Sequence, residues 1–254
     1  MKKLDNQIFQ DRRKSFLSKL DGKAAIIPGA KLVQHHADCE YPFRQESNFW
    51  YLTGFDEPDA IALFLSHKPK GERYILFVHP KNIESEVWNG FRWGTNGAEK
   101  IFKADKSYPI SEFEKELPNY LMGADEIVFP VGKYPEIEHI VLSLWAKQID
   151  NYSRIGRAPR AIRPLGMFLN QMRLIKSEYE ISRMREAVLI SAEAHELVRL
   201  NVGSKKHEKQ IQGLLEGFFL EKGARGPAYN SIVASGDNAC VLHYTANNSE
   251  LKKG

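Results

Sequence analysis

Short apolar stretches are the feature of this sequence that most restricts its fold. The longest of them, 60–65 and 140–146, fall far short of the roughly 20 residues that a membrane-spanning helix needs. They alternate with segments in which apolar residues recur at the helical period of about 3.6 residues. Strands interleaved with helices are typical of an α/β architecture. We therefore predict an α/β protein without a membrane span.

The same pattern predicts the individual elements of the first part of the chain. Strands are predicted at 24–27, 49–52, 60–65, 74–78 and 127–129. Helices are predicted at 7–20, 111–122 and 134–148. Pro118 should bend or end the second helix, whereas Pro135 occupies the first turn of the third, where a missing N–H costs little.

The second part of the chain begins with a clear helix start. Ser177 and Glu180 fit the S-x-x-E capping box, in which both side chains bind free backbone N–H groups at the helix terminus. We expect this helix to end near Asn201, and a second helix to occupy 204–223.

Two strand-like stretches follow these helices. They occupy 229–234 and 240–244, and the segment 235–238 between them has the composition of a tight turn. A unit of two helices and one hairpin leaves a sheet edge open and has little core. The pattern therefore indicates an incomplete domain.

A change of composition marks the boundary between the two parts. The segment 156–166 contains Pro159 and Pro164 and shows little apolar periodicity. We place the boundary near residue 170, which gives a first domain at 1–170 and a second at 171–254.

Composition and charge exclude several classes of protein. Hydrophobic residues make up 43% and charged residues 27% of the 254, which is ordinary for a globular protein and excludes a disordered chain. The net charge of +4 is too small to indicate nucleic acid. The polar N-terminus is not a signal peptide, and Cys39 and Cys240 are too few for a disulfide framework. We expect a cytoplasmic protein with no nucleic-acid or membrane partner.

Common catalytic motifs are absent from the sequence. Two near matches to H-E-x-x-H, beginning at His195 and His207, lack the second histidine, so we interpret both as surface histidines. His35, His36 and Cys39 lie close together, but no second group of ligands accompanies them in the sequence. A polar loop is the better interpretation of that cluster than a metal site.

A few residues stay open to more than one interpretation. The aromatic group at 49–55 has the spacing of a core strand. Trp88 lies in a polar stretch, where it serves either a contact or the packing of a loop. His243, at the end of a predicted strand, is a candidate catalytic or substrate-binding residue. The basic residues between Arg154 and Arg185 are interpreted as solvated, with a phosphate-binding site as the alternative.

Three longer stretches carry a more specific signal. They are DCEYPFRQESNFWYLTGFDEP at 38–58, MRLIKS at 172–177, and the pair YNSIVASG and LHYT at 229–236 and 242–245. In order and spacing these stretches resemble the Xaa-Pro aminopeptidases (aminopeptidase P) over essentially the whole chain.

The resemblance implies a fold, a reaction and a cofactor. It implies a creatinase-like N-terminal α/β domain followed by the start of a pita-bread catalytic domain. Members of that family hydrolyse the bond between an N-terminal residue and a following proline. They use two divalent metal ions, usually Mn²⁺, held by two Asp, one His and two Glu. Such a pair of ions activates the attacking water and polarises the scissile carbonyl.

The sequence departs from that pattern at its C-terminal end. The first metal ligand of the family lies in an L-x-D-A-G motif, which we expect just after Gly254. After Ala224 the sequence contains two carboxylates, Asp237 and Glu250, and neither matches a ligand position. We therefore expect no metal ligand in this chain, and expect it to be an inactive N-terminal fragment of the enzyme.

The resemblance also implies roles for three residues. His243 matches a family histidine that lies beside the metal centre and donates a hydrogen bond to the reacting peptide. Tyr229 is expected to line the same substrate pocket. Trp88 matches a loop that, in oligomeric members, approaches a neighbour's active site, so we expect substrate contact there and a homo-oligomer. No specific metal binding to residues 1–254 is expected.

Three alternatives remain at this point. A prolidase-type dipeptidase would share the fold but prefer dipeptides. A non-catalytic protein would use the cap and the partial second domain as a binding or oligomerisation module. A nucleic-acid binder would use the basic residues from Arg154 to Arg185.

Overall fold

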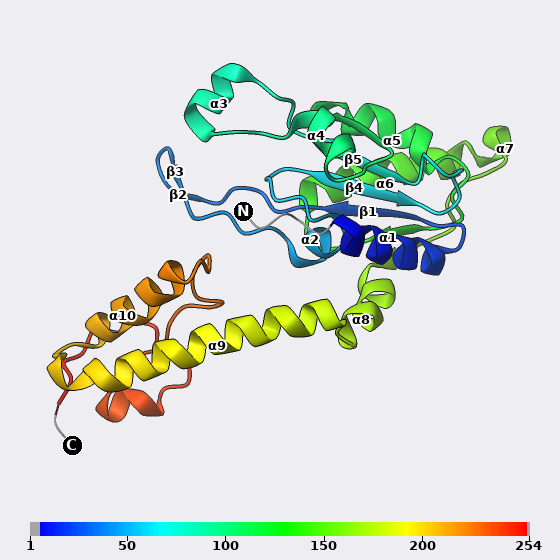
Figure 1. Ribbon diagram of the computed structural model, residues 1–254. Helices are drawn as coiled ribbons and strands as arrows, with labels where there is room; N and C mark the ends of the chain where they lie inside the picture. Colours follow the sequence, from blue (N-terminus) through cyan, green and yellow to red (C-terminus); the bar gives the residue numbers. More distant parts are fainter. Residues whose placement is uncertain (1–5, 253–254) are drawn as a thin grey trace. The chain divides into compact units, whose positions relative to one another are not determined.

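The structure, a computed structural model, describes residues 6–252, apart from the side chains of Ser85, Ser153 and Ile155. It divides into two compact units, Met1–Leu174 and Ile175–Gly254. Figure 1 shows a sheet covered by helices in the first unit, and helices joined to irregular chain in the second. Within the described range, no helix combines the length and apolar character needed to cross a membrane.

A mixed six-stranded sheet with the order β6-β5-β4-β1-β7-β8 is the centre of the first unit. Its strands are β1 (Ala24–Pro28), β4 (Ile61–Leu65), β5 (Tyr74–Val78), β6 (Lys106–Pro109), β7 (Ile127–Phe129) and β8 (Ile162–Pro164). β4 pairs antiparallel with β1 and β5, while the pairs β5–β6, β1–β7 and β7–β8 are parallel. All residues of β1, β4, β5 and β7 are buried, so their sequences are continuous apolar runs.

Helices cover both faces of the sheet, which gives three layers (Figure 1). The helices of this unit are α1 (Asn6–Leu20), α2 (Ser47–Thr53), α3 (Ile83–Asn89), α4 (Gly94–Lys100), α5 (Phe113–Leu121), α6 (Pro135–Asp150), α7 (Tyr152–Ile155) and α8 (Gly166–Leu174), and a 3₁₀ turn, η1 (Ile110–Glu112), precedes α5. Alternation along β1 sends Ala25 and Ile27 to the core under α1, α2 and α8, and Ala24 and Ile26 to the core under α5 and α6. Pro118 lies inside α5 rather than ending it.

The predicted strand at 49–52 is wrong, because these residues form α2. The Glu46 carboxylate accepts hydrogen bonds from the backbone N–H groups of Asn48 and Phe49, which caps the helix N-terminus. Gly54, with φ of 65°, ends the helix in the left-handed conformation. Two buried arginines of α1, Arg12 and Arg13, donate hydrogen bonds to the last carbonyls of α2. Capping at both ends outweighs the strand preference of the aromatic residues.

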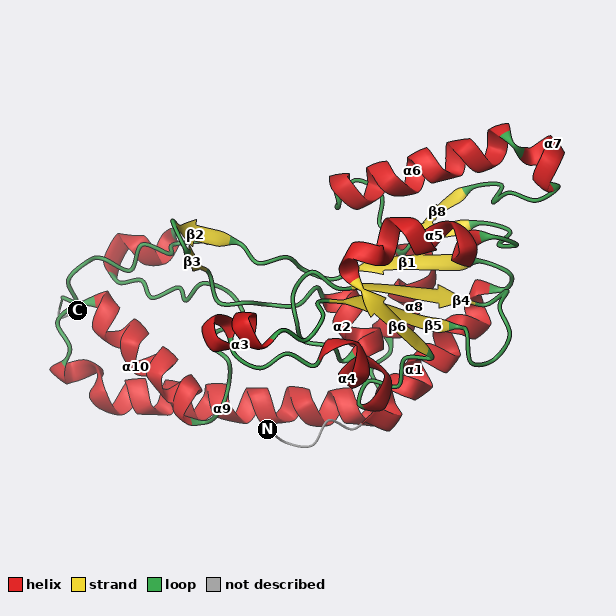
Figure 2. Cartoon of the chain, turned by 90° about the horizontal axis from the view of Figure 1, so that it is seen from above, coloured by secondary structure: helices red, strands yellow, loops and turns green. Residues whose placement is uncertain are grey.

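Two segments of the first unit extend away from the six-stranded sheet (Figure 2). One is the hairpin of β2 (Gln34–His36) and β3 (Cys39–Glu40), whose residues are all exposed. The other is α3, which carries Trp88 with 87% of its surface exposed. Trp88 therefore lies on a short helix and not in an irregular loop.

The second unit consists of α9 (Glu178–Asn201), a 3₁₀ turn η2 (Val202–Ser204), α10 (Glu208–Glu221) and a 3₁₀ turn η3 (Gly236–Cys240). The predicted capping box of Ser177 and Glu180 is confirmed. The second helix begins later than predicted, because His207 caps it by accepting a hydrogen bond from the Lys209 N–H. The two predicted strands, 229–234 and 240–244, are wrong: the first is irregular, and the second begins inside η3 and continues as a turn.

Candidate functional site

The predicted site residues lie in both units of the chain. His243 follows η3 in a turn of the second unit, between the 89%-exposed Leu242 and the half-buried Tyr244. Tyr229 lies in the same unit and is 75% exposed. Within the described part of the chain, no hydrogen bond or ring contact joins His243 to Tyr229. Trp88 belongs to the first unit.

The side chain that organises the segment around His243 is one that the sequence analysis did not single out. Glu208, the first residue of α10, is completely buried. Its Oε1 accepts hydrogen bonds from the N–H of Ser235 at 2.8 Å and from the Ser235 hydroxyl at 3.1 Å. Its Oε2 accepts from the Tyr244 hydroxyl at 2.8 Å and from the N–H of Ser249 at 2.9 Å.

These hydrogen bonds decide the charge of Glu208. Burial by itself raises the pKa of the carboxyl group, because it removes the charged form from water. The donors from Ser249, Tyr244, Ser235 and Asn238 outweigh burial and lower the pKa to about 2. The group is therefore a carboxylate at neutral pH.

A second buried polar residue, Asn247, completes the arrangement. Its Oδ1 accepts a hydrogen bond from the N–H of Val233 at 2.9 Å. Its Nδ2 donates to the Ser231 carbonyl at 2.8 Å and to Gln212 Oε1 at 3.0 Å. These contacts occupy the Val233 N–H and the Ser231 carbonyl, two backbone groups of the first predicted strand that a sheet would pair with a neighbouring strand.

The segment 38–58, which carries the resemblance, has a structural centre at Gln45. This side chain is buried, and its Oε1 accepts hydrogen bonds from the N–H groups of Ala30 at 2.7 Å and Glu46 at 2.8 Å. Its Nε2 donates to the carbonyls of Phe55 at 3.2 Å and Glu57 at 2.8 Å. Gln45 therefore joins the chain after β1 to both ends of α2.

The same segment also contacts the end of the first unit. Arg173 donates a hydrogen bond to the Asn48 Oδ1 at 2.5 Å, and the Tyr51 hydroxyl donates to the Met172 carbonyl at 3.3 Å. Two of the sequence stretches that carry the resemblance, 38–58 and 172–177, thus meet at α2 and α8.

The described residues do not by themselves fit a metal centre. Among residues 6–252, no group of three or more His, Cys, Asp or Glu side chains is placed to hold a metal ion. His35, His36 and Cys39 are exposed on the β2–β3 hairpin, as expected for a polar loop. His195 is exposed on α9 and bonded to the Ser191 carbonyl, while His207 caps α10. Neither histidine takes part in a ligand group.

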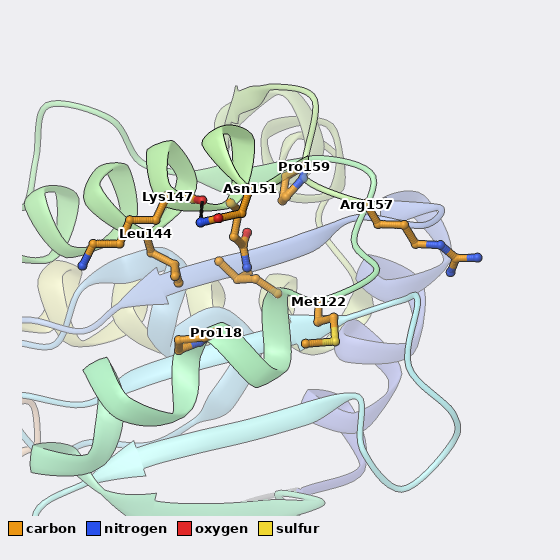
Figure 3. A pocket seen from close by; sticks show the side chains of 9 residues that line it. Pro118, Met122, Leu144, Lys147, Asn151, Arg157 and Pro159 are labelled. Carbon is orange, nitrogen blue, oxygen red and sulfur yellow. Dashed lines mark hydrogen bonds between the residues drawn. The ribbon is translucent and has the colours of Figure 1, made fainter. Parts of the chain in front are cut away.

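The described part of the first unit has shallow hollows on its surface. One, of about 220 Å³, lies between α5 and α6, with Pro118, Met122 and Leu144 among its lining residues. Asn151 donates a hydrogen bond to the Lys147 carbonyl at its edge (Figure 3). A second hollow, of about 340 Å³, has Glu57, His79 and Arg92 among its lining residues.

Glu57 is the perturbed group of the second hollow. Burial raises its pKa, although the Trp93 N–H donates a hydrogen bond to it at 2.7 Å. The nearby His79 pairs with Asp59 at 3.4 Å. Neither hollow brings a nucleophile together with a base that would activate it.

Comparison with known proteins identifies the two units. Residues 9–129 match the family model for the aminopeptidase P N-terminal domain, and residues 182–254 match metallopeptidase family M24. The chain is 34% identical to the Xaa-Pro aminopeptidase of Escherichia coli and 36% identical to that of Haemophilus influenzae, over its whole length in both cases. It covers 58% and 56% of those proteins.

Solved structures give the same result. The Pseudomonas aeruginosa aminopeptidase PepP matches with a TM-score of 0.92 and 33% identity, over 100% of this chain and 57% of that one. Escherichia coli aminopeptidase P with the inhibitor Pro-Leu matches with a TM-score of 0.91 and 34% identity, over 98% and 57%. The chain thus spans little more than half the length of these relatives. It is an α/β protein that carries an aminopeptidase P N-terminal domain followed by the start of an M24 metallopeptidase domain.

Proposed function

We propose that this chain is the N-terminal part of an aminopeptidase that releases the first residue from peptides with proline in the second position. The observation that carries the proposal is the match to Xaa-Pro aminopeptidases over the whole chain, with both domains in the same order. Residues 1–170 would form the N-terminal domain and residues 171–254 the start of the catalytic domain. The protein would act in the cytoplasm as a homo-oligomer.

The cofactor of the whole enzyme would be two divalent metal ions, most simply Mn²⁺. Membership of a metallopeptidase family supports this, and a zinc-substituted Escherichia coli aminopeptidase P is among the similar structures. The ions would activate water and polarise the scissile carbonyl in the longer protein. Because residues 6–252 offer no ligand group, no step of the reaction is assigned to a metal bound to this chain.

Within this chain we assign substrate roles to three residues. His243 would donate a hydrogen bond to the reacting peptide, and its exposure leaves the imidazole accessible. Tyr229 would line the same pocket. Trp88, exposed on α3, would contact substrate bound to a neighbouring subunit.

The decisive experiment is to sequence the gene beyond codon 254 and to assay the product of the full reading frame. We expect an L-x-D-A-G-like strand, further Asp, His and Glu ligands, and metal-dependent hydrolysis of an Xaa-Pro-containing peptide. The 254-residue chain should show no hydrolysis in the same assay. A stop codon directly after Gly254 would remove the catalytic proposal, because the chain would then lack the ligands.

Trp88 is tested in the full-length protein by Trp88→Ala. The substitution should raise KM for long peptides more than for short ones, because the proposed contact lies away from the scissile bond. Unchanged kinetics on both classes of peptide would refute the substrate role.

A second candidate function rests on the exposed apolar side chains of the second unit. Val188, Leu189 and Leu242 are 64%, 63% and 89% exposed. A non-catalytic module would cover such residues with a partner. A monodisperse 254-residue protein would favour the module, whereas aggregation would favour a truncated enzyme.

A further inference from the structure

We propose that Glu208 is a positioning residue that fixes the course of the segment carrying His243. The role of His243 itself rests on the proposed function, but the contacts of Glu208 do not. One carboxylate binds the segment on both sides of His243, which we call its two limbs. The limb before His243 is bound at Ser235, and the limb after it at Tyr244 and Ser249. Because Tyr244 is the next residue after His243, the hydrogen bond to its hydroxyl anchors the chain directly after His243.

The charge of Glu208 is satisfied by hydrogen-bond donors alone. Among the described residues, no basic side chain forms an ion pair with this buried carboxylate. A buried charge without such a pair is costly unless hydrogen bonds satisfy its oxygens. Two backbone N–H groups, two hydroxyls and the Asn238 amide do so here, and the N-terminus of α10 adds a favourable dipole. Because burying a carboxylate costs free energy, simple filling of the core does not explain why Glu208 occupies this position.

The geometry requires a carboxylate and excludes the amide of the same shape. Oε1 faces the Ser235 N–H and Oε2 faces the Ser249 N–H, and neither backbone donor can be turned into an acceptor. A glutamine in either orientation would place its NH₂ group against one of these N–H groups. Glu208→Gln should therefore release one limb although it changes neither the size nor the shape of the side chain.

Glu216, two turns further along α10, offers a matched control. It accepts hydrogen bonds from the Ser231 hydroxyl at 2.7 Å and from Gln212 Nε2 at 2.9 Å. Both donors belong to side chains that can reorient, so Glu216→Gln can re-form its contacts. The two variants remove the same charge from the same helix, and only Glu208→Gln opposes a backbone donor.

The test is NMR and amide hydrogen exchange on the product of the full reading frame, and it needs no catalytic activity. In Glu208→Gln, we expect exchange at Ser235 or Ser249 to accelerate about tenfold or more, and the His243 imidazole signals to shift. The α9 amides and the signals of His195 should stay as in the wild type. In Glu216→Gln, exchange at Ser235 and Ser249 and the His243 signals should remain unchanged.

A milder variant keeps the proposal testable if Glu208→Gln does not fold. Tyr244→Phe leaves the carboxylate and removes one donor, so it should shift the His243 signals while exchange at Ser235 stays within about twofold. An unshifted His243 in either variant would overturn the positioning role, and a uniform rise of exchange across α9 and α10 would reduce Glu208 to a general stabiliser. A failed peptidase assay with these NMR effects intact would refute only the proposed function.

Discussion

Gln45→Glu replaces one NH₂ group of the buried side chain by an oxygen and should make the stability of the first unit depend on pH. In the wild type, Nε2 donates to the carbonyls of Phe55 and Glu57 at 3.2 and 2.8 Å. A carboxylate would direct a negatively charged oxygen at these two acceptors. The side chain has almost the same size, so the effect isolates the two donor hydrogens.

The expected magnitude follows from these contacts. When the introduced carboxyl group is protonated, its single O–H can donate to one carbonyl, and the other carbonyl loses its partner at a cost of about 1–2 kcal/mol. When the group is ionised, burial and both carbonyls disfavour the charge, while the two N–H bonds to Oε1 persist in either state. The folded-state pKa of the introduced carboxyl should therefore lie well above the value of about 4.3 for a free glutamate.

The sign of the pH dependence follows from linkage. Between about pH 4.3 and the raised folded-state pKa, the native state binds more protons than the unfolded state, so the free energy of unfolding falls as pH rises. The slope relative to the wild type should approach about −1.4 kcal/mol per pH unit, for a further loss of roughly 2–4 kcal/mol by pH 7. The variant is thus closest to the wild type near pH 4.

Urea unfolding followed by tryptophan fluorescence is the assay for this effect. The four tryptophans lie in the first unit, so the signal reports that unit. They are Trp50, Trp88, Trp93 and Trp145. Gln171→Glu, at an exposed position of α8, is the control and should change stability by less than about 0.5 kcal/mol at any pH. A Gln45→Glu penalty that is equal at pH 4 and pH 7 would refute the reasoning.

Two further tests address contacts near Gln45, and a third addresses Glu208 in the second unit. Gly29→Ala should destabilise the first unit by about 1–3 kcal/mol in the same urea assay, because the added Cβ would lie 2.9 Å from Gln45 Oε1 and 3.1 Å from the Ala60 carbonyl. Glu46→Ala should cost about 1 kcal/mol through loss of the α2 cap, and an unchanged urea midpoint would contradict that capping role. With its pKa lowered to about 2, Glu208 contributes stability that is fully present above the unfolded-state pKa of about 4.3 and is lost as pH falls toward 2. The segment 231–250 should therefore keep its NMR signals down to about pH 3 and lose them at lower pH. Loss of these signals already at pH 5 would show that protonation of Glu208 does not release the segment.

The buried strands of the first unit were predictable because burial on both faces leaves a continuous apolar run. The strands at Tyr74–Val78 and Ile127–Phe129 have the predicted bounds. The outermost strands, β6 and β8, were missed because they are partly exposed and contain Lys, Arg and Pro. Nothing in such a short polar sequence distinguishes an edge strand from a loop, so its identity depends on the neighbour that it pairs with.

The second unit shows a different limit. Its helices were predictable from local signals, such as the capping box at Ser177. Its predicted hairpin was wrong. In the first of the two stretches, the side chain of Asn247 binds the Val233 N–H and the Ser231 carbonyl, which a strand would pair with a neighbouring strand. Local propensity does not indicate which of the two sets of partners a segment will use.

The residues that make the family recognisable differ from those proposed to act on substrate. In the segment 38–58, Gln45 and Glu46 direct their hydrogen bonds to backbone groups of the first unit, so their identity is fixed by folding. His243, by contrast, is exposed and makes no hydrogen bond within the described chain, so folding places no comparable demand on its side chain. Folding instead requires Glu208, which binds the chain on both sides of His243. In this unit, therefore, the buried Glu208 and not the exposed His243 is the residue whose identity the fold determines.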